Sequence, residues 1–160
     1  MSTGAGSTTS FVNEGIIEDL TTGNESSTDI DNYQTGQIYR IVTGVGSSLT
    51  IRNSGYIGEI STGYASWNTI ENSESGSIDA VDSGSDSHTT IDNYGIIHDI
   101  RAYSNSHTGI YNQSGGWIGT VTGEEASHVL VSTNGAINAI TALGESDLDI
   151  RSTGAIGTVT

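Results

Sequence analysis

One unit of this chain reads Ile51-Arg52-Asn53-Ser54-Gly55-Tyr56-Ile57-Gly58-Glu59-Ile60, and the 160 residues contain eight units of this kind. Three alternate units, which open at Ile30, Ile70 and Ile110, carry two extra residues between Asn and Gly. The units open at Phe11, Ile30, Ile51, Ile70, Ile91, Ile110, Val131 and Ile150, so that spacings of 19 and 21 residues alternate. Two units therefore form a 40-residue super-repeat. Self-similarity at such periods indicates a solenoid.

Alignment of the units produces columns of uniform chemistry. The central column is always Ile, at Ile17, Ile38, Ile57, Ile78, Ile97, Ile118, Ile137 and Ile156. The Gly column contains Gly15, Gly36, Gly55, Gly76, Gly95, Gly116, Gly135 and Gly154. An Asn column precedes it at Asn13, Asn32, Asn53, Asn72, Asn93 and Asn112, and Thr133 and Ser152 replace Asn in the last two units. We expect a positive φ or a close backbone approach at the Gly column, and hydrogen bonds along the Asn column.

The local period of the units is two residues, which is typical of β-strands. Ser26, Thr28 and Ile30 alternate with Asp29 and Asp31. A single unit cannot bury its Ile face, whereas rungs stacked about 4.8 Å apart bury it against identical neighbours. The sequence therefore predicts an all-β fold, a parallel β-solenoid of eight rungs that forms one domain over residues 1–160. We expect a right-handed coil of triangular cross-section, although the sequence does not fix the handedness.

The charge of the chain restricts its partners. Four Lys and Arg residues stand against 19 Asp and Glu residues, for a net charge of -15. Nucleic acids and anionic membranes require basic surfaces, so neither is an expected partner. No apolar run approaches the roughly 20 residues that a transmembrane helix needs, and residues 1–10 do not resemble a signal peptide. The absence of Cys excludes disulfides and fits an exported protein.

Two segments carry a resemblance to a known group of proteins. Ile91-Asp92-Asn93-Tyr94-Gly95-Ile96-Ile97 and Ile110-Tyr111-Asn112-Gln113-Ser114-Gly115-Gly116-Trp117-Ile118 resemble the repeats of bacterial autotransporter passengers and filamentous-haemagglutinin-type adhesins. The resemblance extends over nearly the whole chain. The motif that carries it is short and has low specificity. It implies a right-handed β-helix at the bacterial surface, with a role in adhesion or biofilm formation. The export domains and membrane barrel of those families have no counterpart in this sequence.

Both ends of the repeat array lack an atypical polar cap, which monomeric solenoids normally carry. Met1 falls in the same apolar column as Ile41, and Val159 falls in that column at the other end. We therefore expect head-to-tail association of identical chains into a filament. The assembly ends would be formed by Met1, Phe11, Ile150, Ile156 and Val159. The alternative is a segment of a long surface adhesin, whose neighbouring rungs would continue the stack.

Chemistry-bearing residues are few. His88, His107 and His128 share one outward column. Such a column could bind zinc or respond to pH, and the alternative is a surface column without a function. Acidic residues allow calcium binding, but the calcium-binding nonapeptide is absent. No nucleophile has a base at a recognisable spacing, so we expect neither catalytic residues nor a cofactor, and a structural protein rather than an enzyme. Ice binding is a weaker alternative, because the Thr column of Thr3, Thr22, Thr43 and Thr62 does not continue. Glycan binding is also weaker, because aromatic residues such as Trp67, Trp117, Tyr56 and Tyr64 form no continuous stripe. Any receptor is unknown.

Overall fold

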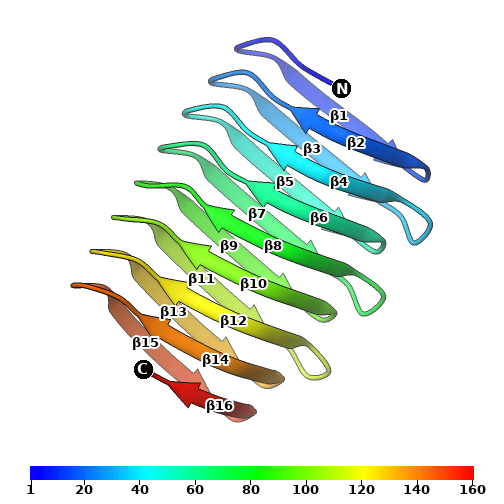
Figure 1. Cartoon of the computed structure of the whole chain (residues 1–160). Coiled ribbons are helices and arrows are strands. Elements are labelled where there is room, and N and C mark those ends of the chain that lie inside the picture. The colour runs from blue at the N-terminus through cyan, green and yellow to red at the C-terminus, as the bar shows by residue number, and fades with distance from the viewer.

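The computed structural model describes residues 1–160 as sixteen β-strands without a helix (Figure 1). The odd-numbered strands form the first sheet and the even-numbered strands form the second, and all neighbours within a sheet are parallel. The first sheet contains β1 (Thr8–Asn13), β3 (Ser27–Asn32), β5 (Ser48–Asn53), β7 (Trp67–Asn72), β9 (His88–Asn93), β11 (His107–Asn112), β13 (His128–Thr133) and β15 (Asp147–Ser152). The second contains β2 (Ile16–Thr21), β4 (Gln37–Val42), β6 (Tyr56–Ser61), β8 (Ser77–Ser83), β10 (Ile96–Ala102), β12 (Trp117–Gly123), β14 (Ala136–Ala142) and β16 (Ala155–Val159).

The predicted parallel β-solenoid is confirmed, and the predicted triangular cross-section is wrong. Each rung consists of one strand of each sheet, so the coil has two faces rather than three. A triangular rung requires a third strand. Here two tight corners per rung reverse the chain, one after the Asn column and the other before the Ser column that contains Ser26 and Ser47.

The register of both sheets follows the columns of the sequence. Ile51 pairs with Ile30 and Ile70 in the first sheet, and Ile57 pairs with Ile38 and Ile78 in the second. These columns, with the one that contains Ile60, meet between the sheets in a core of 22 buried hydrophobic residues. Branched aliphatic side chains suit such strands because they pack well on a pleated surface. The core is therefore continuous along the rod.

The two corners use different backbone solutions. At the Asn–Gly corner the Gly column permits a close approach, since a Cβ on Gly36 would lie 2.2 Å from the Asn32 side-chain oxygen. No residue of the Gly column has a positive φ, so that part of the expectation is wrong. Apart from Gly115, the residues with positive φ lie at the other corner, and they include the non-glycine residues Glu25, Ala65 and Ala126. The close approach of stacked corners, not the turn itself, explains the Gly column.

The stack has two unpaired ends. β1 and β2 have a strand neighbour on one side only, and so do β15 and β16 at the opposite end. Several apolar side chains of these end rungs are only partly buried, among them Phe11, Ile17, Ile150 and Ile156, whereas Leu20 of β2 is fully buried. No helix in the structure is long and apolar enough to cross a membrane.

Candidate functional site

The predicted Asn column forms a buried ladder of hydrogen bonds. The Asn13 Nδ2 donates to Asn32 Oδ1 at 2.8 Å, and the same bond recurs along the stack to Asn112. The Asn112 Nδ2 donates to Thr133 Oγ1 at 3.1 Å, where the amide ladder ends. Each Asn also donates to a corner carbonyl, as Asn32 does to Gly36 at 3.3 Å. The Asn column therefore holds successive corners together.

The three predicted His residues form a stacked column on the outer face of the first sheet. The ring centroids of His88 and His107 lie 4.9 Å apart, and those of His107 and His128 lie 5.5 Å apart. Trp67 extends the column, because its ring stacks on His88 at 4.2 Å with an angle of 9° between the planes. His128 Nε2 lies 3.6 Å from an oxygen of Asp147 in the last rung. The sequence pattern places Trp67 in the same column as the His residues, but it does not reveal that the Trp67 ring stacks on His88.

The stacked rings are unsuited to chelation as they stand. Parallel ring planes direct the ring nitrogens of neighbouring residues side by side, whereas a tetrahedral zinc site needs ligands that converge on one point. No group of three or more His, Cys, Asp or Glu side chains is arranged to hold a metal ion. The predicted zinc and calcium alternatives therefore have no preformed site in this structure.

A groove of about 350 Å³ runs beside the ring column on the first sheet. The rings of Trp67, His88, His107 and His128 line one side of it. Thr69, Thr90, Gly109 and Leu130, which lie two residues further along the same strands, also line it. The remaining lining residues are Ser48, Asn68, Thr89 and Thr108. None of the lining residues is Asp, Glu, Lys or Arg. This groove is an uncharged region on a chain with a net charge of -15.

A second hollow, of about 360 Å³, lies on the outer face of the second sheet and is charged. Its lining includes Glu59, Asp82, Asp99 and Arg101. Burial raises the pKa of the Asp82 carboxyl above its usual value, and Arg101, 3.7 Å away, lowers it by a smaller amount. Arg101 also lies 3.8 Å from Glu124. Glu59 lies 3.5 Å from Arg40, and the Thr120 hydroxyl donates to Asp99, so each charged group of this hollow already has a partner.

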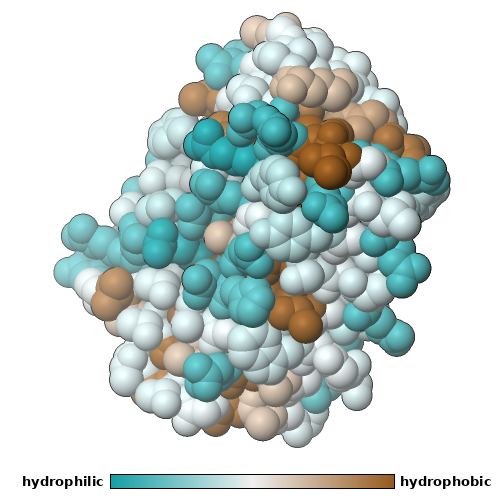
Figure 2. All heavy atoms as spheres, turned by 45° about the vertical axis from the view of Figure 1, so that its right-hand side comes forward, coloured by the Kyte–Doolittle hydropathy of each residue, from teal (hydrophilic) through white to brown (hydrophobic).

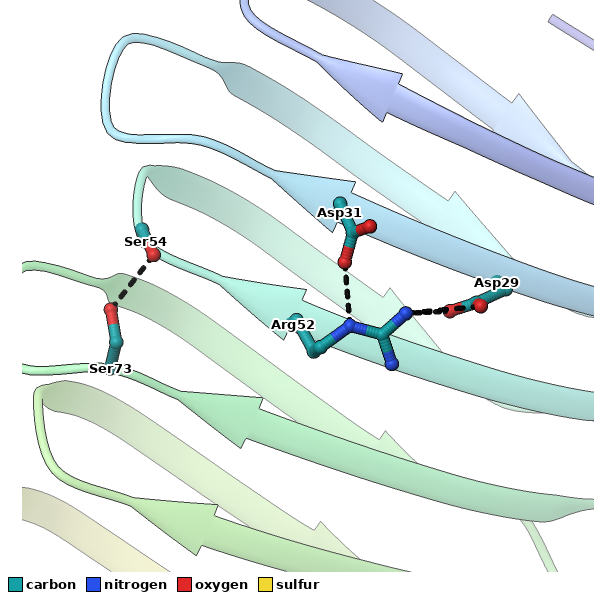
Figure 3. A network of polar contacts seen from close by, with 5 residues as sticks. All are labelled: Asp29, Asp31, Arg52, Ser54 and Ser73. Carbon is teal, nitrogen blue, oxygen red and sulfur yellow. Dashed lines mark hydrogen bonds and ion pairs between the residues drawn. The ribbon is translucent and has the colours of Figure 1, made fainter.

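The outward column of Asp31, Arg52 and Glu71 is an ion-pair cluster rather than an alternating ladder. The Arg52 Nε donates to Asp31 at 2.6 Å, and the Nη2 donates to Asp29 at 2.9 Å (Figure 3). Glu71 makes no ion pair with Arg52. At the nearby corner the Ser73 hydroxyl donates to Ser54 at 3.0 Å (Figure 3). Such exposed pairs contribute about 0–1 kcal/mol each.

The Thr column considered for ice binding points into the molecule. Thr22, Thr43 and Thr62 are all buried, and Thr43 and Thr62 accept hydrogen bonds from Gly63 and Gly84 at the corner. The sequence pattern did not show which side of the sheet this column faces, because the corner separates it from the strand alternation. No ice-binding face is formed by this column.

The predicted assembly ends lie at opposite ends of the stack. Met1 accepts a hydrogen bond from the Thr21 amide at 2.9 Å, and Ser2 pairs with Thr21. Val159 pairs with Ile140 and is 51% exposed. Met1 and Val159 thus lie in equivalent positions of the second sheet, as the sequence predicts.

Comparison of the chain with protein-family models, curated proteins and solved structures gives no match. The strand order and the register define its fold class as a parallel β-solenoid of two sheets and about eight turns. Two outer faces, two corners and two open ends are the surfaces available for function.

Proposed function

We propose that the chain is a structural protein that assembles head to tail, through its end rungs, into a β-solenoid filament. The observation that carries this proposal is the equivalence of the two ends. Docking β1 onto β15 and β2 onto β16 of a second copy would place Phe11 over Ile150 and Ile17 over Ile156. These are the columns that pair like with like inside the rod. The contact is heterologous and does not close, so it generates a filament.

The energetics of such a junction follow from those of the interior. Each docked rung would pair the free N–H and C=O groups of two edge strands, which otherwise remain free to pair with a strand of another molecule. It would also cover the partly buried apolar side chains of both end rungs. Burial of apolar surface is worth about 25 cal/mol per Å². The same contacts stabilise every internal rung interface.

One segment must move for docking in register. Met1 and Ser2 lie beside Thr21, and Val159 and Thr160 occupy the equivalent place beside Thr141 of the previous rung. In the junction the Val159 carbonyl of one copy would replace the Met1 carbonyl as acceptor for the Thr21 amide of the other. Removal of Met1 and Ser2 should therefore increase the rate of filament growth.

The flanks of the rod favour end contacts over sideways contacts. A net charge of -15 per chain makes side-by-side copies repel each other. Figure 2 shows that apolar residues on one face form separate patches among hydrophilic residues rather than a continuous surface. Because exposed charges are screened by salt over about 10 Å at 0.1 M, we expect lateral bundling to increase with ionic strength.

We place this fibre outside the cell, as a surface or matrix component with no catalytic role. The absence of Cys and the resemblance to bacterial surface adhesins support this location. The rungs also contain no long insertion of the kind that forms a catalytic cleft. A repeat segment of a longer adhesin is the second interpretation, in which further rungs of the same chain would cover the ends.

Negative-stain electron microscopy and sedimentation at moderate salt test the proposal. The unmodified chain should form uniform filaments. Val159→Asp should block elongation and leave the folded rod intact, because the new carboxylate would be buried only in the junction. Val45→Asp is the matched control, since Val45 is similarly exposed at 47% but lies on the side of the rod.

Two outcomes would overturn the filament proposal. Filaments that persist in Val159→Asp would show that the end rungs are not the junction. Dispersed short rods of the unmodified chain, under conditions where circular dichroism shows a folded β-protein, would refute self-assembly and favour the adhesin segment.

A further inference from the structure

The column of stacked rings ends at an open indole face. Trp67 is the most exposed of the Phe, Tyr and Trp residues, at 62%. One face of its ring stacks on His88, and in the rung on the other side its strand neighbour is Ser48. Ser27 precedes Ser48 in the same outward column, so small side chains leave the second indole face uncovered. An exposed aromatic face of this kind is a stacking platform that a ligand can use.

The groove beside these rings offers neutral hydrogen-bonding groups. A neutral imidazole has one donor and one acceptor nitrogen, a threonine hydroxyl has both functions, and an indole has one donor. His88, His107, Thr69 and Thr90 therefore present both functions within one groove. A complementary ligand carries groups that both donate and accept hydrogen bonds, as hydroxyl groups do.

The charge of the chain restricts this ligand further. The groove has no carboxylate or basic residue in its lining, whereas the hollow of similar size on the second sheet contains four charged side chains. An anion would be repelled by the net charge of -15, and a cation would find no carboxylate in the groove. The groove thus favours a neutral ligand.

We propose that the groove between the Trp67–His128 ring column and Thr90 binds neutral oligosaccharides. The C–H groups on one face of a pyranose ring carry partial positive charge, which matches the negative face of the Trp67 indole. The hydroxyl groups of the sugar exchange hydrogen bonds with the imidazoles and threonines. A volume of about 350 Å³ lies near the lower end of the usual range for small-ligand sites, which suits a short oligosaccharide. This inference goes beyond the filament proposal, since the groove lies on the flank of the rod and away from its ends.

The structure supplies two variants that separate binding from folding. Trp67→Ala removes the stacking platform from an exposed position. Gly109→Val fills the floor of the groove, and the structure tolerates a Cβ at Gly109, whose nearest contact would be the Tyr111 ring at 3.6 Å. The matched controls on the second sheet are Trp117→Ala and Ala139→Val, at an exposed Trp and a small outward residue.

The test titrates cellobiose, maltose and lactose into the full chain and measures heat by calorimetry and Trp67 fluorescence in a Trp117→Phe background. We expect at least one of these sugars to bind with millimolar affinity and to change the Trp67 emission. Trp67→Ala should weaken that binding at least tenfold, and Gly109→Val should abolish it. A uronic acid disaccharide should bind more weakly, and neither control variant should change the affinity.

Three results would overturn the proposal. The first is the absence of both heat and emission change with all three neutral sugars. The second is sugar binding that survives Gly109→Val. The third is a Trp67 emission that changes with protein concentration alone, which would assign the groove to contacts between copies of the chain. None of these results bears on the end junction, which Val159→Asp tests separately.

Discussion

Thr108 and Thr133 are equally buried, and they differ in whether the hydroxyl has a partner. Thr108 Oγ1 makes no hydrogen bond, whereas Thr133 Oγ1 accepts from Asn112. An unpaired buried hydroxyl costs about 1–3 kcal/mol. Val is close in shape to Thr, and Val129 already occupies the position next to Thr108 in the following rung. The same substitution at these two threonines can therefore measure how much the hydrogen bond at the end of the Asn ladder contributes to the free energy of unfolding.

We predict opposite effects of the same substitution at these two sites. Thr108→Val should raise the free energy of unfolding by about 1 kcal/mol, because it removes the unpaired hydroxyl. Thr133→Val should lower it by about 1–2 kcal/mol, because it leaves the Asn112 amide with one partner fewer. Denaturant unfolding followed by circular dichroism measures both. Shifts of the same sign would contradict the hydrogen-bond assignment.

Asp82 links stability to pH. Because burial raises the pKa of this carboxyl in the folded chain, the native state binds the proton more tightly than the unfolded state does. Ionised Asp82 therefore destabilises the fold at pH values above its raised pKa, and this cost disappears below the ordinary Asp value of about 3.9. Asp82→Asn should consequently raise the melting temperature at pH 7 by about 2 °C.

The gain from Asp82→Asn should vanish at about pH 3, where both states hold the proton. Thermal melts at the two pH values measure the difference. Glu145→Gln, at an exposed corner residue, is the control for removal of one negative charge. An equal gain at both pH values would contradict the role of burial.

At the scale of the strand, β10 contains two adjacent isoleucines with opposite environments. Ile97 is fully buried in the central column, and Ile96 is 44% exposed on the outer face. Ile97→Asp should lower the free energy of unfolding by more than about 4 kcal/mol, because it places an unpaired charge in the core. Ile96→Asp should change it by about 0.5 kcal/mol or less. Equal melting temperatures of the two variants would refute the column assignment.

The strands were predictable from the sequence because the columns repeat with the register of the sheets. Ile57 and Ile60 are both buried although three positions separate them, so Gly58 and Glu59 both face outward in β6. Strict alternation does not predict this pair, and only the eightfold repetition of both apolar columns does. The number of faces was not predictable, since corner geometry depends on positive φ values at residues such as Glu25 and Ala65. Their side chains give no signal of that conformation.

At the scale of the whole molecule, the candidate groove was only partly predictable. The repeat placed His88, His107 and His128 in one outward column, and the structure confirms that placement. Trp67 belongs to the same column as His88, so only the orientation of its ring required the coordinates. The lining by Thr90 depends on which columns lie side by side on the folded face. The repeat also placed Met1 and Val159 in one column. Only the coordinates show that Met1 of one copy occupies the place that Val159 of a docked copy would take.

The two termini lie at opposite ends of the stack (Figure 1), and each strand pairs only with the rungs before and after it. Tension between the termini therefore acts first on an outermost rung and can detach it without disturbing the others. Each detached rung would release about 70 Å of extended chain. Under load, the rod would therefore lengthen in nearly equal steps, one rung at a time, and each step would dissipate mechanical work.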